Sequence, residues 1–265
     1  MKFSIITVTY NAAETLEKAI LSVKNQTYKN FEHIIIDGMS SDNTLMQINK
    51  HLYSQICYIS EPDKGIFDAM NKGVTKATGD YIYFLNADDS FYSSDVLNMV
   101  ALHIEENQYP DILYGHVYKI VESGRKYLYK KELLNRLLCK GQMPSHQSMF
   151  FKSGLFKTTG FFKIQYQSAS DLDFVIRCAK ANIIAVYVNA PIAVFSLSGV
   201  SNSGVQGSIE SMQLIKKYYG LWWYVLSVFR YIPILLFRTI ASKLGFLKFY
   251  RQKIYPLWQN KTEHE

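Results

Sequence analysis

The chain has 265 residues, of which 48% are hydrophobic and 19% charged, with a formal net charge of +7. This composition excludes a disordered chain and is typical of a globular protein with a substantial core. Three widely separated cysteines, Cys57, Cys139 and Cys178, argue against a disulfide framework or a zinc site and favour a reducing compartment. The apolar run before Tyr10 is too short for a signal peptide, so we expect a cytoplasmic protein.

Residues 3–85 alternate apolar runs with longer segments of helical periodicity. We expect strands at 3–9, 31–37, 56–60 and 81–85, and helices at 12–26, 42–52 and 66–77. Continuous apolar strands separated by helices are typical of βαβ units, which form a parallel sheet covered on both faces. The sequence therefore predicts an α/β sandwich.

The four predicted strands are each followed by a polar loop. These loops are TYN at 9–11, DGMSSDNT at 37–44, EPDKG at 61–65 and NADD at 86–89. In such sheets, ligands bind beyond the carboxyl ends of the strands. All four loops carry groups suited to a nucleotide or a phosphate, which predicts one shared binding site.

The last of these loops has two interpretations. Asp88 and Asp89 directly follow an apolar strand, where adjacent carboxylates are costly to desolvate unless a cation or several donors compensate them. This favours a metal site. The same residues also suit a turn, in which Asp89 or Ser90 caps a helix at 93–103.

After residue 95 the pattern becomes mixed. We expect strands at 112–114, 117–121, 126–129, 148–151, 184–188 and 192–195, and helices at 133–139 and 172–181. This segment is predicted to extend the same sheet and to form the second half of the cleft.

Four segments carry a resemblance to a known family: IITVTYNAAETLEKAILSVKNQTYKNFEHIIIDGMSSDNT, DKGIFDAMNKGVTKATGDYIYFLNADDSFY, SHQSMF and SASDLDF. In this order and spacing the chain resembles family-2 glycosyltransferases of the GT-A fold, especially bacterial enzymes that assemble surface polysaccharides. The resemblance implies a Rossmann-like α/β/α sandwich with a mostly parallel sheet. It also implies inverting transfer of a sugar from a nucleotide-diphosphate sugar, expected to be a UDP-sugar, to a hydroxyl of a glycan or polyprenyl-linked acceptor.

The resemblance assigns the first two loops to the nucleotide. Thr9, Tyr10 and Asn11 would line the base pocket, and Asp37 would accept a hydrogen bond from the base or sugar. The alternative for Asp37 is a turn residue that precedes Gly38.

The third loop and its helix would approach the diphosphate and donor sugar. Lys64 would offer an ammonium group to phosphate, and Gly65 would let the backbone approach closely. The alternative is a solvated lysine and a glycine at a helix start. Asn71 would either brace the loop or touch the ligand.

The resemblance implies a divalent metal, Mg²⁺ or Mn²⁺, with Asp88 as its direct ligand, because hard oxygen ligands suit a cation that bridges a diphosphate. Asn86 departs from the family's usual pair of acids and is assigned to the ribose. Asp89 would support the metal site or cap a helix.

Asp171, at the start of a predicted helix, aligns with the family's catalytic acid and is assigned as the general base. Alternatively, Ser170 or Asp171 only caps that helix. Asp173 would orient the acceptor or pair with Arg177 at i+4. Two further acceptor-side residues are His146 and Gln147, and a loop at 196–202 is expected to close over the site.

The net positive charge lies entirely at the end of the chain. Residues 214–265 contain nine Lys or Arg and two Glu, which accounts for the whole +7. We therefore expect a catalytic domain at 1–213, with a nucleotide-binding half at about 1–95 and an acceptor half at about 96–213, followed by a basic aromatic tail.

The tail, at 214–258, is rich in Trp, Tyr, Phe and Leu. Its uncharged stretches are too short to span a bilayer, and Arg230 would cost about 2.5–3.5 kcal/mol at a bilayer centre. We expect amphipathic helices on the anionic inner surface of the cell membrane. The alternative is packing on the catalytic core or on a second subunit. Nucleic acid is not expected as a partner.

The sequence also has two alternative functional interpretations. A sugar nucleotidyltransferase is disfavoured because TYNAAETLEK has no Gly and no cation before Lys18. A non-catalytic, membrane-associated assembly module would retain the fold without the reaction.

Overall fold

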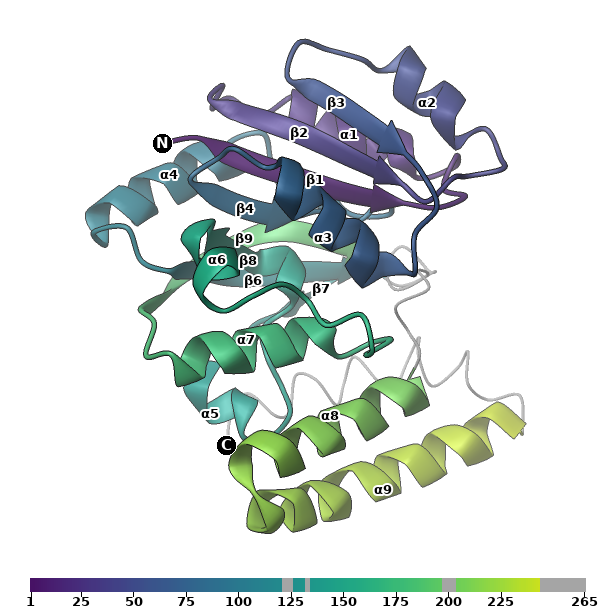
Figure 1. Ribbon diagram of the computed structural model, residues 1–265, viewed down its shortest axis with the longest axis vertical. Coiled ribbons are helices and arrows are strands. Elements are labelled where there is room, and N and C mark those ends of the chain that lie inside the picture. Colours follow the sequence, from purple (N-terminus) through teal and green to yellow (C-terminus); the bar gives the residue numbers. More distant parts are fainter. Residues whose placement is uncertain (121–125, 132–133, 197–203, 244–265) are drawn as a thin grey trace.

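The computed structural model describes residues 1–120, 126–131, 134–196 and 204–243. In these ranges a single mixed sheet of nine strands has helices on both faces, and two long helices lie at one end (Figure 1). The strand order is β3-β2-β1-β4-β8-β6-β9-β5, and β7 pairs with β6.

The first half of the sheet is parallel, as predicted. Its strands are β1 (Phe3–Thr9), β2 (Phe31–Asp37), β3 (Ile56–Ser60) and β4 (Tyr81–Phe84). Its helices are α1 (Leu16–Lys24), α2 (Thr44–Lys50) and α3 (Ile66–Lys76). Because β1 lies between β2 and β4, every residue of β1 is buried, and this explains its uninterrupted apolar sequence.

The second half is mixed. Its strands are β5 (Ser90–Phe91), β6 (Ile112–Ile120), β7 (Lys126–Tyr129), β8 (Met149–Lys152) and β9 (Ala185–Ser196). Its helices are α4 (Val96–Glu106), α5 (Leu134–Leu138), α6 (Gly154–Thr158) and α7 (Ser170–Lys180), with a 3₁₀ turn at His146–Ser148. The antiparallel strand β8 joins β4 to β6, so both halves form one sheet as expected.

Two predicted pairs of strands are each one strand in the structure. The predicted strands at 112–114 and 117–121 merge into β6, and those at 184–188 and 192–195 merge into β9. The pairing of β6 with β9 is irregular between Tyr114 and Val117. There Gly115 faces the Ala190 carbonyl so closely that a Cβ atom would overlap it. The missing side chain lets both strands continue past the irregularity.

The predicted helix cap at Asp89 or Ser90 is wrong. Ser90 and Phe91 instead form β5, which pairs with β9, and the Phe91 ring stacks on Tyr83 with 4.9 Å between centroids. Helix α4 begins later, at Val96, with Asp95 at its N-cap. Pairing with a strand distant in sequence has overridden the local turn chemistry.

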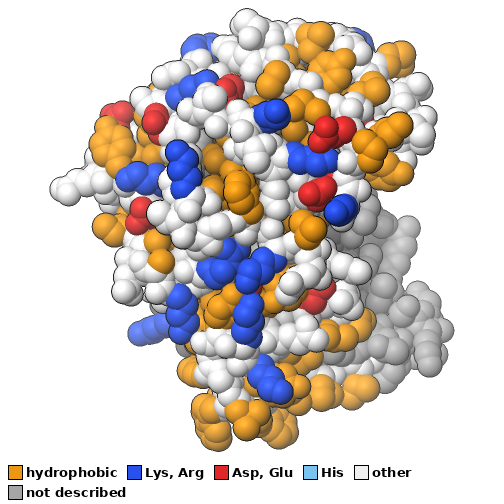
Figure 2. All heavy atoms as spheres, viewed as in Figure 1, with side chains coloured by type: hydrophobic (Ala, Val, Ile, Leu, Met, Phe, Trp, Pro, Cys, Tyr) orange, Lys and Arg blue, Asp and Glu red, His pale blue; other side chains and the backbone are white. Residues whose placement is uncertain are grey.

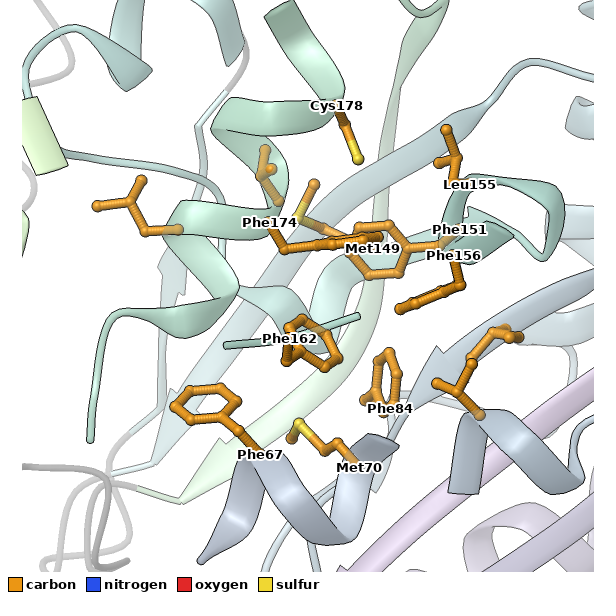
Figure 3. Close-up of a cluster of buried hydrophobic side chains, with 14 of the residues drawn as sticks. Phe67, Met70, Phe84, Met149, Phe151, Leu155, Phe156, Phe162, Phe174 and Cys178 are labelled. Carbon is orange, nitrogen blue, oxygen red and sulfur yellow. The ribbon is translucent and has the colours of Figure 1, made fainter. Parts of the chain in front are cut away.

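A cluster of aromatic side chains holds α6 and α7 against the sheet (Figure 3). The Phe156 and Phe174 rings stack at 4.6 Å, and Phe162 lies 5.2 Å from Phe84 of β4 and 5.0 Å from Phe174. These contacts fix α7 relative to β4. The first turn of α7 and the loop after β4 are therefore held in a fixed position relative to each other.

The end of the chain forms two helices, α8 (Gly204–Tyr219) and α9 (Leu221–Lys243), which meet at Gly220. Leu214 and Ile215 of α8 are fully buried. The predicted domain boundary between 213 and 214 thus falls inside a helix that packs on the α/β core. Helix α8 therefore packs on the α/β core, which is the alternative given above for the start of the tail.

None of the helices in the described ranges is long and apolar enough to cross a membrane.

His33 gives a testable pH dependence. Its ring is fully buried in β2 between the hydroxyls of Thr7 and Tyr53, each 2.9 Å away, and burial lowers its pKa to about 3. The unfolded chain takes up this proton near the ordinary pKa of about 6.5, so stability falls as pH drops below that value.

We expect His33→Gln to flatten the pH dependence of the free energy of unfolding between about pH 6.5 and 3, by up to about 1.4 kcal/mol per pH unit. Urea unfolding across this range measures the slope, and His103→Gln on the surface of α4 serves as the control. An unchanged slope in His33→Gln would show that the buried ring is already charged in the folded state.

Candidate active site

The loops that follow β1, β2 and β3 pack against one another. Gly38, after β2, lies so close to its neighbours that a Cβ atom would overlap the Asp63 carboxylate and lie 3.3 Å from the Tyr10 ring. A side chain at position 38 would require Asp63 to shift. The predicted convergence at the carboxyl end of the sheet is therefore present for these three of the four loops.

Asn11 and Asp37 lock the first two loops together. Asn11 adopts a left-handed conformation, with φ of 48°. Its N–H donates to Ser40 Oγ at 2.8 Å, and its Oδ1 accepts from the Ser41 N–H at 2.9 Å. Asp37 is fully buried and accepts from the Ser40 N–H at 3.0 Å and from Ser60 Oγ at 2.7 Å. Asp37 thus fixes the loop, and its contact with a nucleotide stays a prediction.

The exposed ring of Tyr10 lies beside these locked loops, with two thirds of its surface open. A ring in that position can stack on a planar base. Its role, like that of Asn11 in a base pocket, stays a prediction.

The third loop turns into α3 through Gly65, whose φ of 112° disfavours any other residue. The Gly65 N–H donates to Asp63 Oδ1 at 2.8 Å, and the Lys64 N–H donates to Asp68 Oδ2 at 3.0 Å. The Lys64 side chain is exposed. The carboxylates of Asp63 and Asp68 thus hold the backbone of the third loop, and the exposed Lys64 ammonium can approach a phosphate.

Asn71 of α3 braces a distant segment. Its Nδ2 donates to the Phe162 carbonyl at 2.9 Å, and its Oδ1 accepts from the Phe162 N–H at 3.0 Å. This pair of bonds ties α3 to the chain between α6 and α7. The bracing role is observed, and contact with a donor stays a prediction.

Thr9 is the last residue of β1 and Asn86 follows the neighbouring strand β4, and each has a buried side-chain oxygen without a partner in the described part of the chain. A buried polar atom that lacks a partner costs about 1–3 kcal/mol. Such atoms are rare and point to a missing ligand or water. Thr9 and Asn86, both predicted to bind the donor, are thus positioned to accept hydrogen bonds from a ligand or a water.

Asp88 lies in a partly desolvated position beside these residues. Burial raises the pKa of its carboxyl above the ordinary value, against opposing effects that include the charges of Lys18 and His146. The carboxylate is therefore disfavoured in the protein alone, and a nearby cation would favour it.

His146 connects this region to Asp171. Its Nδ1 lies 3.0 Å from Asp171 Oδ2, and its Nε2 is buried without a partner in the described part of the chain. Asp171 stands in the first turn of α7, where its other oxygen accepts from the Leu172 N–H at 2.8 Å. His146 and Asp171 are therefore in direct contact and the charge of His146 reaches Asp88, which the sequence alone does not establish.

Gln147, next to His146, is a core residue. It is 2% exposed, its Oε1 accepts from the Ser145 hydroxyl, and its backbone carbonyl accepts from the Tyr83 hydroxyl at 2.6 Å. These bonds position the 3₁₀ turn that carries His146. The acceptor role assigned to Gln147 stays a prediction.

Asp173 is also fully buried, and the predicted pair with Arg177 is present at 2.7 Å. Its other oxygen lies 2.8 Å from the Tyr218 hydroxyl and 3.5 Å from Lys217 Nζ, both on α8. Its contacts therefore favour pairing over orientation of the acceptor.

Sequence reasoning missed Glu210 of α8. Its carboxylate, 3% exposed, accepts from the backbone N–H groups of Gln167, Ser168 and Ala169 at 2.9–3.0 Å. Burial acts to raise its pKa, but these hydrogen bonds outweigh burial and lower it. Glu210 is the only acid between Asp173 and Glu263, a signal that could have singled it out. It holds the segment that leads into Asp171.

The described residues contain no group of three or more His, Cys, Asp or Glu that could hold a metal ion by itself. Mg²⁺ is commonly bound by one or two carboxylates together with substrate phosphates. Asp88, with the unpartnered Oδ1 of Asn86 nearby in the chain, fits that kind of site. An all-protein metal cage does not fit.

The predicted closing loop at 196–202 falls almost entirely on residues 197–203, which lie outside the described ranges.

The fold and the polar loops define the class of protein. The structure is similar to TarS of S. aureus in complex with UDP-GlcNAc, with a TM-score of 0.65 and 21% identity over 82% of this chain and 66% of that one. The chain spans 39% of a longer TarS structure. It is also similar to the mannosyltransferase PcManGT of Pyrobaculum calidifontis, in complex with GDP-Man and Mn²⁺. In this case the TM-score is 0.62 and the identity 15%, over 97% of this chain and 83% of that one. The fold is GT-A.

The sequence identifies the family. Residues 4–171 match Glycosyl transferase family 2, and the chain belongs to this family of enzymes. It is 35% identical to a PGL/p-HBAD biosynthesis glycosyltransferase of Mycobacterium bovis BCG, over 81% of this chain and 83% of the relative. The predicted fold and family are both confirmed.

The raised pKa of Asp88 predicts a stabilising substitution. A carboxyl whose pKa is higher in the folded state makes the free energy of unfolding fall as pH rises above about 4. We expect Asp88→Asn to raise the melting temperature at pH 7 and to leave it little changed near pH 4. Thermal unfolding at both pH values measures this, with Asp95→Asn on the surface as control. A destabilised Asp88→Asn at pH 7 would contradict it.

Proposed function

We propose that the protein transfers a sugar, with inversion, from a UDP-sugar to a hydroxyl of a glycan or polyprenyl-linked saccharide in polysaccharide biosynthesis. The observation that carries this proposal is the contact of His146 with Asp171 on one side, within the electrostatic reach of Asp88 on the other. A base for the acceptor and a binding position for the diphosphate would then share one site.

Asp171 acts as the general base. The acceptor oxygen forms a bond to the anomeric carbon while the bond from that carbon to the diphosphate oxygen breaks. The hydroxyl proton passes to the Asp171 carboxylate, and the electron pair leaves with the nucleotide diphosphate. Asp171 lies in the first turn of α7, and the Leu172 N–H holds its other carboxylate oxygen at 2.8 Å.

His146 positions the base. An ionised carboxylate only accepts hydrogen bonds, so Nδ1 is the donor to Asp171. This bond fixes the carboxylate while leaving Nε2 available to a substrate hydroxyl.

The donor is bound at the ends of β1 to β4. Tyr10 and Asn11 hold the base, Asp37 and Asn86 the ribose side, and Lys64 with the Gly65 backbone the diphosphate. The UDP-GlcNAc complex of TarS supports a uridine donor, and the GDP-Man complex of PcManGT makes guanosine the alternative. The sugar is a hexose or an N-acetylhexosamine.

A Mg²⁺ or Mn²⁺ ion would be held by Asp88 together with diphosphate oxygens. When bound, such an ion neutralises charge that develops on the leaving group. The Mn²⁺ in the PcManGT complex supports manganese.

We further propose that the reaction takes place at the cytoplasmic face of the membrane, where a polyprenyl-linked acceptor would lie. The relative in M. bovis BCG is named for PGL/p-HBAD biosynthesis. We propose a peripheral association of the enzyme with that surface.

Asp171→Asn tests the base. We expect release of free UDP from UDP-sugars to fall by about 10²–10⁴-fold, while donor binding measured by thermal shift is retained. Asp95→Asn, exposed and outside the site, is the matched control. Full turnover by Asp171→Asn would remove the base assignment. Donor binding without turnover in the wild-type protein, given a panel of acceptors, would favour the non-catalytic assembly module.

Asp88→Asn tests the metal site through binding alone. We expect a UDP-sugar to raise the melting temperature of the wild-type protein further when Mn²⁺ is present. In Asp88→Asn the additional rise in melting temperature with Mn²⁺ should disappear, while the rise caused by the UDP-sugar alone remains. GDP- and dTDP-sugars run in parallel identify the base. An equal Mn²⁺ increment in both proteins would exclude Asp88 as the ligand.

A further inference from the structure

Helix α9 has two different sides. One side packs on the protein: Ser227 is 4% exposed, and the Tyr231 hydroxyl donates to the Gly141 carbonyl at 3.0 Å. Near the start of the helix, Lys216 Nζ of α8 lies 5.4 Å from the Tyr224 ring. Tyr224, Ser227 and Tyr231 recur at helical spacing, so they define the inner face.

The opposite side, which we call the outer face of α9, is an exposed apolar stripe. Trp222 is 72% exposed and Phe229 74%. The stripe consists of Trp222, Val225, Leu226, Phe229, Ile232 and Leu236. A continuous row of this length is unusual on a monomer surface and marks an interaction site. Figure 2 shows hydrophobic side chains gathered along the lower edge of the molecule, where α9 lies.

The charge around this stripe has one sign. No acid occurs between Glu210 and Glu263, so α9 carries none. Arg230 is exposed on α9 itself, whereas Lys216, which lies against Tyr224 of the inner face, is exposed on α8. In Figure 2, Lys and Arg side chains lie just above the hydrophobic edge. Any partner must accept an apolar face bordered by cations.

A second copy of the chain fits poorly. A two-fold dimer brings the same patch of both subunits together, so the exposed Arg230 of each α9 would border the same interface. An anionic lipid surface satisfies both features at once, because aromatic and aliphatic side chains enter the acyl boundary while Lys and Arg meet the headgroups.

We propose that the outer face of α9 docks on an anionic membrane, with the helix lying in the plane of the interface. No described helix can cross the bilayer, which agrees with this orientation. Two aromatic anchors, Trp222 and Phe229, enter the headgroup region.

The docked helix is joined to the acceptor side of the site. Helix α8, which packs against α9, carries Glu210 and the Lys217–Tyr218 pair. These hold residues 167–169 and Asp173 at the start of α7, next to Asp171. Docking would therefore keep the base at a fixed distance from the lipid surface. This last step rests on the proposed function, whereas the docking itself does not.

The test uses the full chain and vesicles of phosphatidylcholine with or without phosphatidylglycerol, measured by flotation. We expect binding only to the anionic vesicles, weakened by salt. The double substitution Trp222→Ser with Phe229→Ser should lower binding by about tenfold or more, because two large apolar groups no longer enter the interface. Leu102→Ser with Tyr109→Ser, both exposed on or beside α4, is the matched control.

Circular dichroism and donor hydrolysis in solution establish that the α9 variant is folded and retains its site. Loss of vesicle binding with both of these intact supports the proposal. Unchanged vesicle binding in that variant, or no binding by the wild-type protein, overturns it. The proposal is also overturned if light scattering shows a wild-type dimer that the α9 substitutions dissociate while vesicle binding is unchanged. If sugar transfer fails for every donor while the α9-dependent vesicle binding persists, only the proposed function is wrong.

Discussion

The arrangement of the site depends on one hydrogen bond, between His146 and Asp171. His146 comes from the turn before β8, at the centre of the sheet, and Asp171 from the first turn of α7. The bond joins the turn before β8 to the start of α7, the two elements that carry the proposed base and its partner.

Much of the rest of the second half supports that contact. The aromatic cluster around Phe156, Phe162 and Phe174 fixes α7 on the sheet. Glu210 satisfies three successive amide groups just before α7, and the buried Asp173 is surrounded by Arg177, Lys217 and Tyr218. A buried carboxylate is stable only with such partners. Helix α8 is therefore a structural part of the catalytic domain, although its composition separates it from the remainder.

The parallel half could be predicted from the sequence because its information is local. Each apolar run is followed by its own polar loop, and the order of strands follows from βαβ connections. The second half could not be predicted to the same degree. The short strand β5 exists only because Ser90 and Phe91 pair with β9, more than ninety positions later. Glu210 and the merged strands β6 and β9 likewise depend on partners distant in sequence. The residue types of the site were recognisable, but the contact between His146 and Asp171 is a property of the folded protein.

The two hydrogen bonds between Asn71 and Phe162 tie helix α3 to the chain between α6 and α7. Helix α3 starts at the loop beside Lys64, and Phe162 lies in the chain that leads to α7. Any displacement of α3 would therefore be carried to the segment that precedes Asp171, although the two stretches lie far apart in the sequence.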